Sequence, residues 1–174
     1  MKILLVGPQG SGKSTQATLL AEHLSLPKIT MGDIFRQISK EDSPEGQRIK
    51  QILDEGKLVD DVTTAGLVKK RVNQEDVQTG FVMDGYPRTI EQLKMFDPGF
   101  DKVVYLEVPE EEVIKRLLAR GREDDTDELI RTRLNLYYQQ TQPLLDYYKN
   151  SGKLITVDGI GDINKIQDGI RQYF

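Results

Sequence analysis

The sequence predicts an α/β fold in which helices cover both faces of one parallel sheet. Short apolar runs alternate with helical patterns along most of the chain, and a glycine-rich turn follows the first of these runs. Continuous apolar strands are typical of a parallel sheet that is buried on both faces. The length of 174 residues suits a single domain with one hydrophobic core.

Five short apolar runs are the predicted strands. The first, residues 3–6, precedes a helix, because apolar side chains recur from Ala17 to Leu24 at the i, i+3, i+4, i+7 spacing of one buried face. The other runs are residues 28–30, 81–83, 103–106 and 154–157. Each of the last three is followed by a helical pattern, so we expect a five-stranded parallel sheet.

The chain between the second and third strands breaks this alternation. Two polar helical segments, residues 33–40 and 44–55, follow each other with no strand between them. We expect residues 30–60 to form a small helical flap, beside a core made of residues 1–29 and 61–174. The alternative is that this insertion has no binding role.

The segment from residue 127 to residue 150 predicts one long helix with a single buried stripe. Arg133 lies at the edge of that stripe, one turn from Ile130 and Tyr137. A cation in such a place needs a partner or a bound anion, because an unpaired buried charge is costly.

Composition excludes several classes of protein. Lys and Arg number 24 against 28 Asp and Glu, a net charge of −4, which argues against a nucleic-acid partner. The chain has no cysteine and one histidine, so we expect neither a disulfide framework nor a zinc site. The apolar run at residues 3–6 is too short for a signal peptide or a membrane span. We therefore expect a soluble, cytoplasmic protein without a membrane partner.

Residues 7–14 match the P-loop pattern of two glycines with four residues between them, followed by Lys13 and a hydroxyl residue. The loop follows a predicted strand and opens a predicted helix, where backbone N–H groups and the positive helix end can surround phosphates. Lys13 would reach the outer phosphates, and Ser14 could join a magnesium shell. This favours a nucleotide-binding fold of the P-loop NTPase type; a glycine-rich turn without ligand is the alternative.

A second anchor for magnesium is Asp84, which ends the predicted strand at residues 81–83. In a parallel sheet such a carboxylate emerges at the carboxyl edge beside the P-loop, the Walker B arrangement. A helix cap is the other common use of an aspartate in this position.

Six arginines are candidates for holding a second polyanion. Phosphoryl transfer depends on positioning and charge stabilisation, and the planar arginine fork holds phosphate oxygens in pairs. The candidates are Arg36, Arg88, Arg116, Arg120, Arg122 and Arg133. For each of them taken alone, a solvated surface residue or a partner in an ion pair is the more common role.

The sequence resembles the adenylate kinase family of nucleoside monophosphate kinases over essentially its whole length. The shared segments read GPQGSGKSTQ, MGDIFR, DGYPRTIEQ, RLLARGREDD and RTRLNLYYQQTQPLLDYY, in the family's order. The resemblance implies the reaction ATP + AMP ⇌ 2 ADP by direct in-line transfer with Mg²⁺. It also implies a monomeric kinase domain with a core, a monophosphate-binding flap and a lid.

The resemblance assigns a role to each candidate. The ATP-binding positions would be Gly10, Ser11, Gly12, Lys13, Ser14, Thr15, Arg116 and Gly161. The AMP-binding positions would be Met31, Arg36, Leu53, Lys57, Val59, Gly85, Arg88, Gln92, Arg122 and Arg133. The catalytic set would be Lys13, Arg88, Arg120, Arg122 and Arg133, with Ser14 and Asp84 on the metal, partly through water.

The chain departs from the family pattern at three points. Ser14 stands where the family commonly has glycine, and Met31 replaces a common threonine on the acceptor side. Residues 120–125 hold only a vestige of the lid, because Gly121 alone separates Arg120 from Arg122. A lid excludes water from the reacting phosphates, so we expect more hydrolysis of ATP than in a relative with a long lid.

Two other functions stay open. A UMP/CMP kinase would share the fold and most of the arginines, and Met31 leans that way while Gln92 leans toward AMP. A nucleotide-dependent switch would bind ATP without a phosphate acceptor, which would leave the second set of arginines without a purpose.

Overall fold

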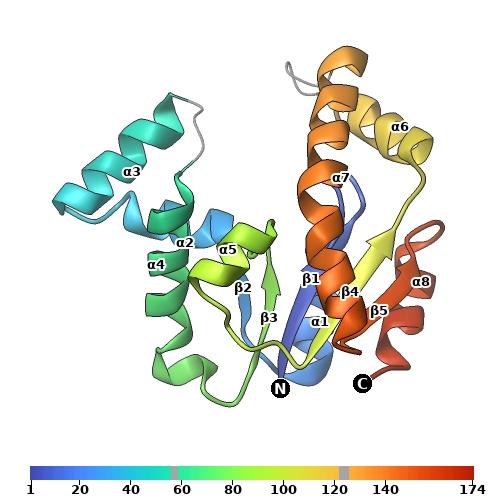
Figure 1. Cartoon of the computed structure of the whole chain (residues 1–174), viewed down its shortest axis with the longest axis horizontal. Helices are drawn as coiled ribbons and strands as arrows, with labels where there is room; N and C mark the ends of the chain where they lie inside the picture. Colours follow the sequence, from blue (N-terminus) through green and yellow to red (C-terminus); the bar gives the residue numbers. More distant parts are fainter. Residues whose placement is uncertain (56–58, 122–125) are drawn as a thin grey trace.

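The strand β1 (Lys2–Val6) lies at the centre of a parallel sheet (Figure 1). The structure, a computed structural model, describes residues 1–55, 59–121 and 126–174. Within these ranges the sheet has five strands in the order β2-β3-β1-β4-β5, which confirms the prediction. The other strands are β2 (Lys28–Thr30), β3 (Phe81–Asp84), β4 (Lys102–Glu107) and β5 (Leu154–Asp158).

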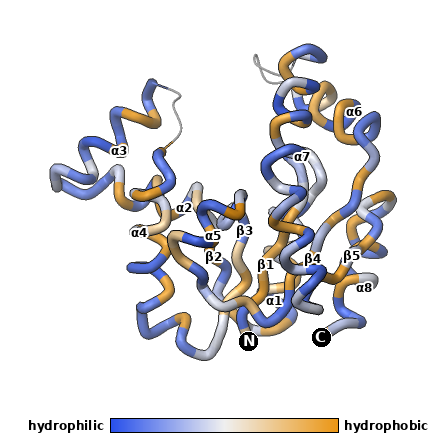
Figure 2. The backbone as a smooth tube through the Cα atoms, viewed as in Figure 1, coloured by the Kyte–Doolittle hydropathy of each residue, from blue (hydrophilic) through white to orange (hydrophobic). Residues whose placement is uncertain are grey.

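Helices pack on both faces of the sheet, as predicted. On one face, Leu5 and Val104 pack against α1 (Lys13–Leu24) and α8 (Ile163–Arg171). Leu4 points to the other face, because side chains alternate along a strand. The helices of that face are α4 (Asp61–Val72), α5 (Ile90–Met95) and α7 (Asp127–Asn150). Figure 2 shows the apolar residues gathered along the strands at the centre.

Two helices replace a strand between β2 and α4. They are α2 (Met31–Ile38) and α3 (Pro44–Asp54), and Figure 1 shows α3 standing away from the sheet. The helix predicted over residues 33–40 begins and ends two residues earlier, at Met31 and Ile38. It begins earlier because the Thr30 side chain caps it by accepting a hydrogen bond from the Asp33 N–H. The second prediction was one residue too long, since Glu55 is already the C-cap of α3.

The helix α7 carries the buried stripe that the sequence predicts. Its N-terminal half packs Ile130 and Leu134 against Val113 and Leu117 of α6 (Glu110–Arg120). Its C-terminal half buries Tyr148 in the core on the α4 face of the sheet. The connection between β3 and α4 adds a short 3-10 helix, η1 (Glu75–Val77). None of the described helices combines the length and apolar character that crossing a bilayer requires.

Candidate active site

The P-loop connects β1, the central strand, to the first turn of α1. Gly10 and Gly12 both adopt φ of +88°, a left-handed conformation that side chains rarely allow. A Cβ atom on Gly10 would also lie 2.9 Å from Cγ of Leu117. Gly12 is the N-cap of α1 and offers no side chain to cap it. The first N–H groups of α1 therefore face an approaching anion at the positive end of the helix dipole.

Lys13 extends from the end of this loop into a charged and enclosed environment. Its Nζ donates a hydrogen bond to the backbone oxygen of Pro8 at 3.3 Å. Burial lowers the pKa of Lys13; the Asp84 carboxylate opposes this shift and the Arg88 guanidinium adds to it. The charges of Asp84 and Arg88 thus both act on Lys13 beside the P-loop, and a bound phosphate would stabilise its ammonium group.

Ser14 and Asp84 lie in direct contact across the carboxyl edge of the sheet. The Ser14 hydroxyl donates a hydrogen bond to Oδ2 of Asp84. Asp84 is only 6% exposed, and its Oδ1 has no hydrogen-bond partner among the described residues. A buried carboxylate oxygen without a donor, next to a hydroxyl oxygen, fits the oxygen ligands that Mg²⁺ prefers.

Ser14 and Asp84 alone do not complete the coordination shell of a metal ion. The described residues contain no cluster of three or more His, Cys, Asp or Glu side chains that could hold one. Mg²⁺ commonly uses one or two protein oxygens and completes its shell with water and substrate phosphates. The donor set at this edge is of that type.

Arg116 joins the P-loop to the loop that follows β5. Its Nη2 donates to the backbone oxygen of Gly159 at 3.0 Å, and its Nη1 lies 3.5 Å from the backbone oxygen of Ser11. Glu112, one turn earlier on α6, accepts from Nε at 2.8 Å and orients the guanidinium. Gly161, with φ of +112°, lies two residues beyond Gly159. The structure therefore brings Arg116, the P-loop and the Gly161 loop together.

Gln16 is a contact residue in this region that sequence reasoning missed. It is only 2% exposed, and its Nε2 donates to the backbone oxygen of Ile163 at 3.0 Å. A polar residue one turn before Leu20, on the apolar face of the predicted helix, was the available signal. The segment between Gly159 and Ile163 is thus hydrogen-bonded at both ends, to Arg116 of α6 and to Gln16 of α1.

The turn after β3 holds several of the predicted acceptor residues. Arg88 is exposed there, and its Nε donates to the backbone oxygen of Gly85 at 3.1 Å. Gly85 adopts φ of +99°, and a Cβ atom on it would touch Met31 at 3.5 Å. Met31 itself is 3% exposed and belongs to the core. Gln92 is buried nearby, with its side-chain amide hydrogen-bonded at both ends.

Residues 30–60, which we predicted to form a flap, include other acceptor candidates, whose side chains differ in exposure. Arg36 pairs with Asp33 at 2.6 Å, and both side chains are more than half exposed. Hydrogen bonds from Thr30 and Arg36 lower the pKa of Asp33. Leu53 and Val59 are partly buried against the core, while Lys57 lies outside the described residues.

Two further arginines of the predicted set lie on α6 and α7. Arg120 is exposed at the end of α6, and Arg133 is partly buried on α7. Both of them make contacts. Arg122 lies outside the described residues, as does most of the predicted lid segment 120–125. His23, the one histidine of the sequence, is exposed in the last turn of α1.

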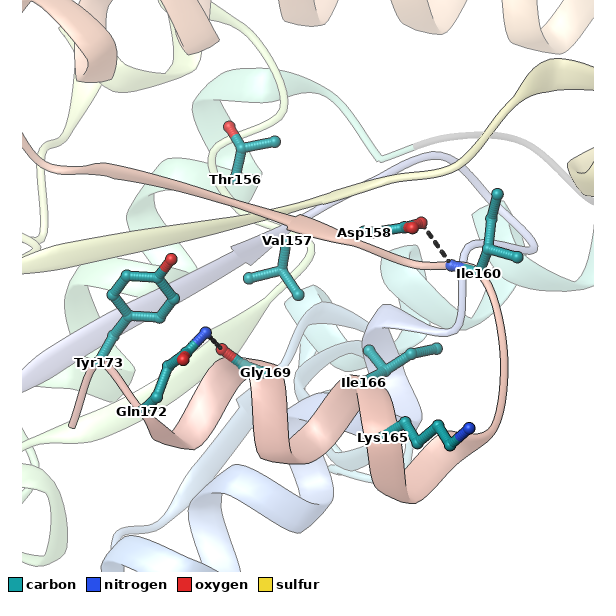
Figure 3. A pocket seen from close by; sticks show the side chains of 9 residues that line it. All are labelled: Thr156, Val157, Asp158, Ile160, Lys165, Ile166, Gly169, Gln172 and Tyr173. Atoms are coloured by element: carbon teal, nitrogen blue, oxygen red, sulfur yellow. Dashed lines mark hydrogen bonds between the residues drawn. The ribbon is translucent and has the colours of Figure 1, made fainter.

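A pocket of about 320 Å³ lies elsewhere, between the end of β5 and α8 (Figure 3). Its lining is mixed, with Asp158 accepting from the Ile160 N–H at one end and Tyr173 at the other. A second pocket, of about 560 Å³, shares Asp158 and Ile160 and extends to Tyr105 and Tyr138. Neither pocket is lined by a residue predicted for the nucleotide sites.

A glycine-rich loop follows the central strand β1, and a carboxylate lies at the end of the neighbouring strand β3. This arrangement defines a P-loop nucleotide-binding protein. Residues 5–153 match the family model described as adenylate kinase. The chain therefore belongs to the adenylate kinase family, a family of phosphotransferases.

Curated relatives named adenylate kinase match nearly the whole chain. One from Nocardia farcinica is 42% identical over 175 residues, covering 97% of this chain and 96% of the relative. One from Mycolicibacterium vanbaalenii is 44% identical over 173 residues, covering 95% and 94%. Adenylate kinase 1 from a Nostoc species is 43% identical over 165 residues, covering 91% and 90%.

Proposed function

We propose that the protein is an adenylate kinase that catalyses ATP + AMP ⇌ 2 ADP by direct in-line transfer. The observation that carries this proposal is the contact of the Ser14 hydroxyl with Asp84 beside the P-loop, together with Arg88 in the turn that follows Asp84. Lys13, at the end of the P-loop, would follow the phosphoryl group as it moves between two polyanions.

The donor half of the mechanism uses the P-loop. The N–H groups at Gly10 to Thr15 cradle the ATP phosphates, and Lys13 stabilises charge on the transferring group. Arg116 and the backbone around Gly161 face the donor base. Bound Mg²⁺ would supply charge neutralisation between the outer phosphates. Ser14 and Asp84 would hold it, Asp84 partly through water.

The acceptor half uses the flap and the turn after β3. Arg36 and Arg88 grip the AMP phosphate, while Arg120, Arg122 and Arg133 converge on the phosphates of both nucleotides. Gln92 and Gly85 contact the adenine, and Met31, Leu53, Lys57 and Val59 flank the nucleotide. No general base is needed, because the attacking phosphate oxygen is already ionised.

The proposed organisation is a single kinase domain. Residues 1–29 and 61–174 form its core, residues 30–60 its monophosphate-binding flap, and residues 120–125 a vestigial lid. The protein acts as a cytoplasmic monomer on small-molecule nucleotides, with Mg²⁺ and without zinc. ATP turnover without acceptor tests the lid assignment: a rate as low as in a long-lid relative argues against it.

An acceptor screen with direct detection of ADP tests the function. ATP is held constant, and AMP, CMP and UMP are compared as acceptors. We expect AMP to be preferred; a preference for CMP or UMP would instead identify a UMP/CMP kinase.

A bisubstrate compound, two adenosines joined by five phosphates, separates a kinase from a switch. It occupies both sites together, so it should bind far more tightly than ATP. Equal affinity for the two compounds would favour a nucleotide-dependent switch without an acceptor site.

A further inference from the structure

The side chain of Gln92 is held at both ends of its amide by residues from two other segments. Its Oε1 accepts a hydrogen bond from the Arg88 backbone N–H at 2.8 Å. Its Nε2 donates to Oδ1 of Asp61 at 2.7 Å. Gln92 is 7% exposed, so solvent offers few competing partners.

These two partners allow only one orientation of the amide. An ionised carboxylate can only accept hydrogen bonds, so Asp61 must face the NH₂ group of Gln92. A backbone N–H can only donate, so Arg88 must face the carbonyl oxygen. Turning the amide by 180° would place donor against donor at one end and acceptor against acceptor at the other, both unfavourable in a buried site.

The partner Asp61 is itself held in place. It is the first residue of α4, and the neighbouring Asp60 caps this helix by accepting from the Thr63 N–H at 2.8 Å.

The backbone of Gln92 is held as well, because the Tyr86 hydroxyl donates to its carbonyl oxygen at 2.8 Å. Burial, together with the Asp61 charge, raises the pKa of Tyr86 to about 12, so this donor stays protonated at neutral pH.

An amide fixed in this way keeps one N–H and one acceptor lone pair of Oε1 for a ligand. Such a pair complements a base edge with an acceptor nitrogen beside an amino donor, the pattern of N1 and the 6-amino group in adenine. The 6-oxo purines reverse that pattern, because N1 carries a proton and the amino group is replaced by an oxygen. An amide that turns freely could hydrogen-bond to either kind of base edge. An amide fixed in this orientation complements only the 6-amino edge of adenine.

We propose that Asp61 is a specificity-determining positioning residue, which holds Gln92 in the orientation that favours a 6-amino purine monophosphate over a 6-oxo one. The inference rests on the proposed function, in which Gln92 faces the acceptor base. Asp61 acts through Gln92 and does not contact the nucleotide.

AMP and IMP are the probes, because their bases differ only at this edge. The ratio of kcat/KM for AMP to that for IMP is measured at saturating ATP in the full chain. In Asp61→Ala we expect this ratio to fall about tenfold, with KM for ATP changed less than about twofold, as suits the loss of one hydrogen bond to a charged group. Asp61→Asn should restore most of the ratio, because its amide oxygen can accept from Gln92.

Asp60→Asn is the matched control. It removes the adjacent carboxylate charge but keeps a side chain that can cap α4, and Asp60 makes no hydrogen bond to Gln92, so the AMP to IMP ratio should stay unchanged. Asp61→Ser provides a second variant for the case in which Asp61→Ala folds poorly. It is too short to reach Gln92, and serine is well accepted in a first helical turn.

A thermodynamic cycle with Gln92→Ala tests the route of the effect. In that background we expect Asp61→Ala to cause no further change in the ratio. A fall of the same size there, or an unchanged ratio in both Asp61→Ala and Asp61→Ser, would overturn the role of Asp61 while leaving the kinase intact. A wild-type protein that phosphorylates neither AMP nor IMP would contradict the proposed function and, with it, this inference.

Discussion

The hydroxyl of Ser14 donates a hydrogen bond to the carboxylate of Asp84, and this contact joins the first turn of α1 to the end of β3. It places a hydroxyl oxygen and a carboxylate together at the carboxyl edge of the sheet, where open α/β sheets bind ligands. The second carboxylate oxygen of Asp84 is buried without a hydrogen-bond partner among the described residues.

The first prediction concerns this pair. Asp84→Asn should raise the Mg²⁺ concentration required for half-maximal activity about 10- to 100-fold, because an amide is a weaker metal ligand than a carboxylate. Ser14→Gly should have a smaller effect in the same direction, since water can replace the hydroxyl. Titration of activity with Mg²⁺ at fixed ATP measures both, and an unchanged titration in Asp84→Asn would exclude the metal role.

The second prediction concerns Arg88. Arg88→Ala should lower kcat/KM for AMP at least about tenfold, because charge-assisted hydrogen bonds to the acceptor phosphate are lost. ATP binding should be largely spared. Arg131→Ala is the control, since Arg131 pairs with Asp127 and Glu110 on the outside of α6 and α7. If AMP use by Arg88→Ala equals that of the control, Arg88 does not hold the acceptor.

The third prediction concerns Arg116 and the loop after β5. Arg116→Ala removes the hydrogen bond to the Gly159 oxygen and so releases the segment that we propose to face the donor base. KM for ATP should rise about tenfold while KM for AMP stays nearly constant. Lys115→Ala is the neighbouring control, because the Lys115 side chain is 81% exposed. Equal changes for both nucleotides would show a general loss of structure.

The fourth prediction concerns Asp60 and pH. Asp60→Ala should cost about 0.5–2 kcal/mol of the free energy of unfolding at neutral pH, the usual range for a lost helix cap. Hydrogen bonds from Thr63 lower the pKa of Asp60, with a smaller contribution from Arg48. The unfolded chain therefore binds the proton more tightly, and the stabilisation is lost as pH falls below the ordinary value of 3.8.

Chemical denaturation across the acid range measures this effect. The difference between wild type and Asp60→Ala should shrink toward low pH, while Asp60→Asn, which caps without titrating, should lack this contribution to the pH dependence. A difference that stays constant through the acid range would show that the Asp60 charge plays no part in the cap.

Local patterns were sufficient for much of the fold. The five strands, the long helix α7 and the P-loop follow from apolar runs, helical spacing and glycine placement, each of which operates within a few residues. The start of α2 was wrong because the Thr30 side chain begins the helix at Met31, two residues earlier than the polar pattern suggests.

Contacts between distant segments were beyond these patterns. Two side-chain hydrogen bonds join residues that share no motif: one links Gln16 to Ile163, and the other links Asp61 to Gln92. A single sequence holds no signal that pairs them, since a buried glutamine or a helix-start aspartate can find many partners.

The sequence by itself determined that a phosphate-binding turn links a buried strand to a helix, because the glycines and Lys13 act over a few consecutive residues. The sequence also predicted that Asp84 lies beside the P-loop, but only the tertiary structure decided that the Ser14 hydroxyl donates to its carboxylate and that Asp61 meets Gln92. These contacts depend on β3 lying next to β1 and on α4 packing beside α5, and such neighbours are chosen by burial of the whole core rather than by any one segment.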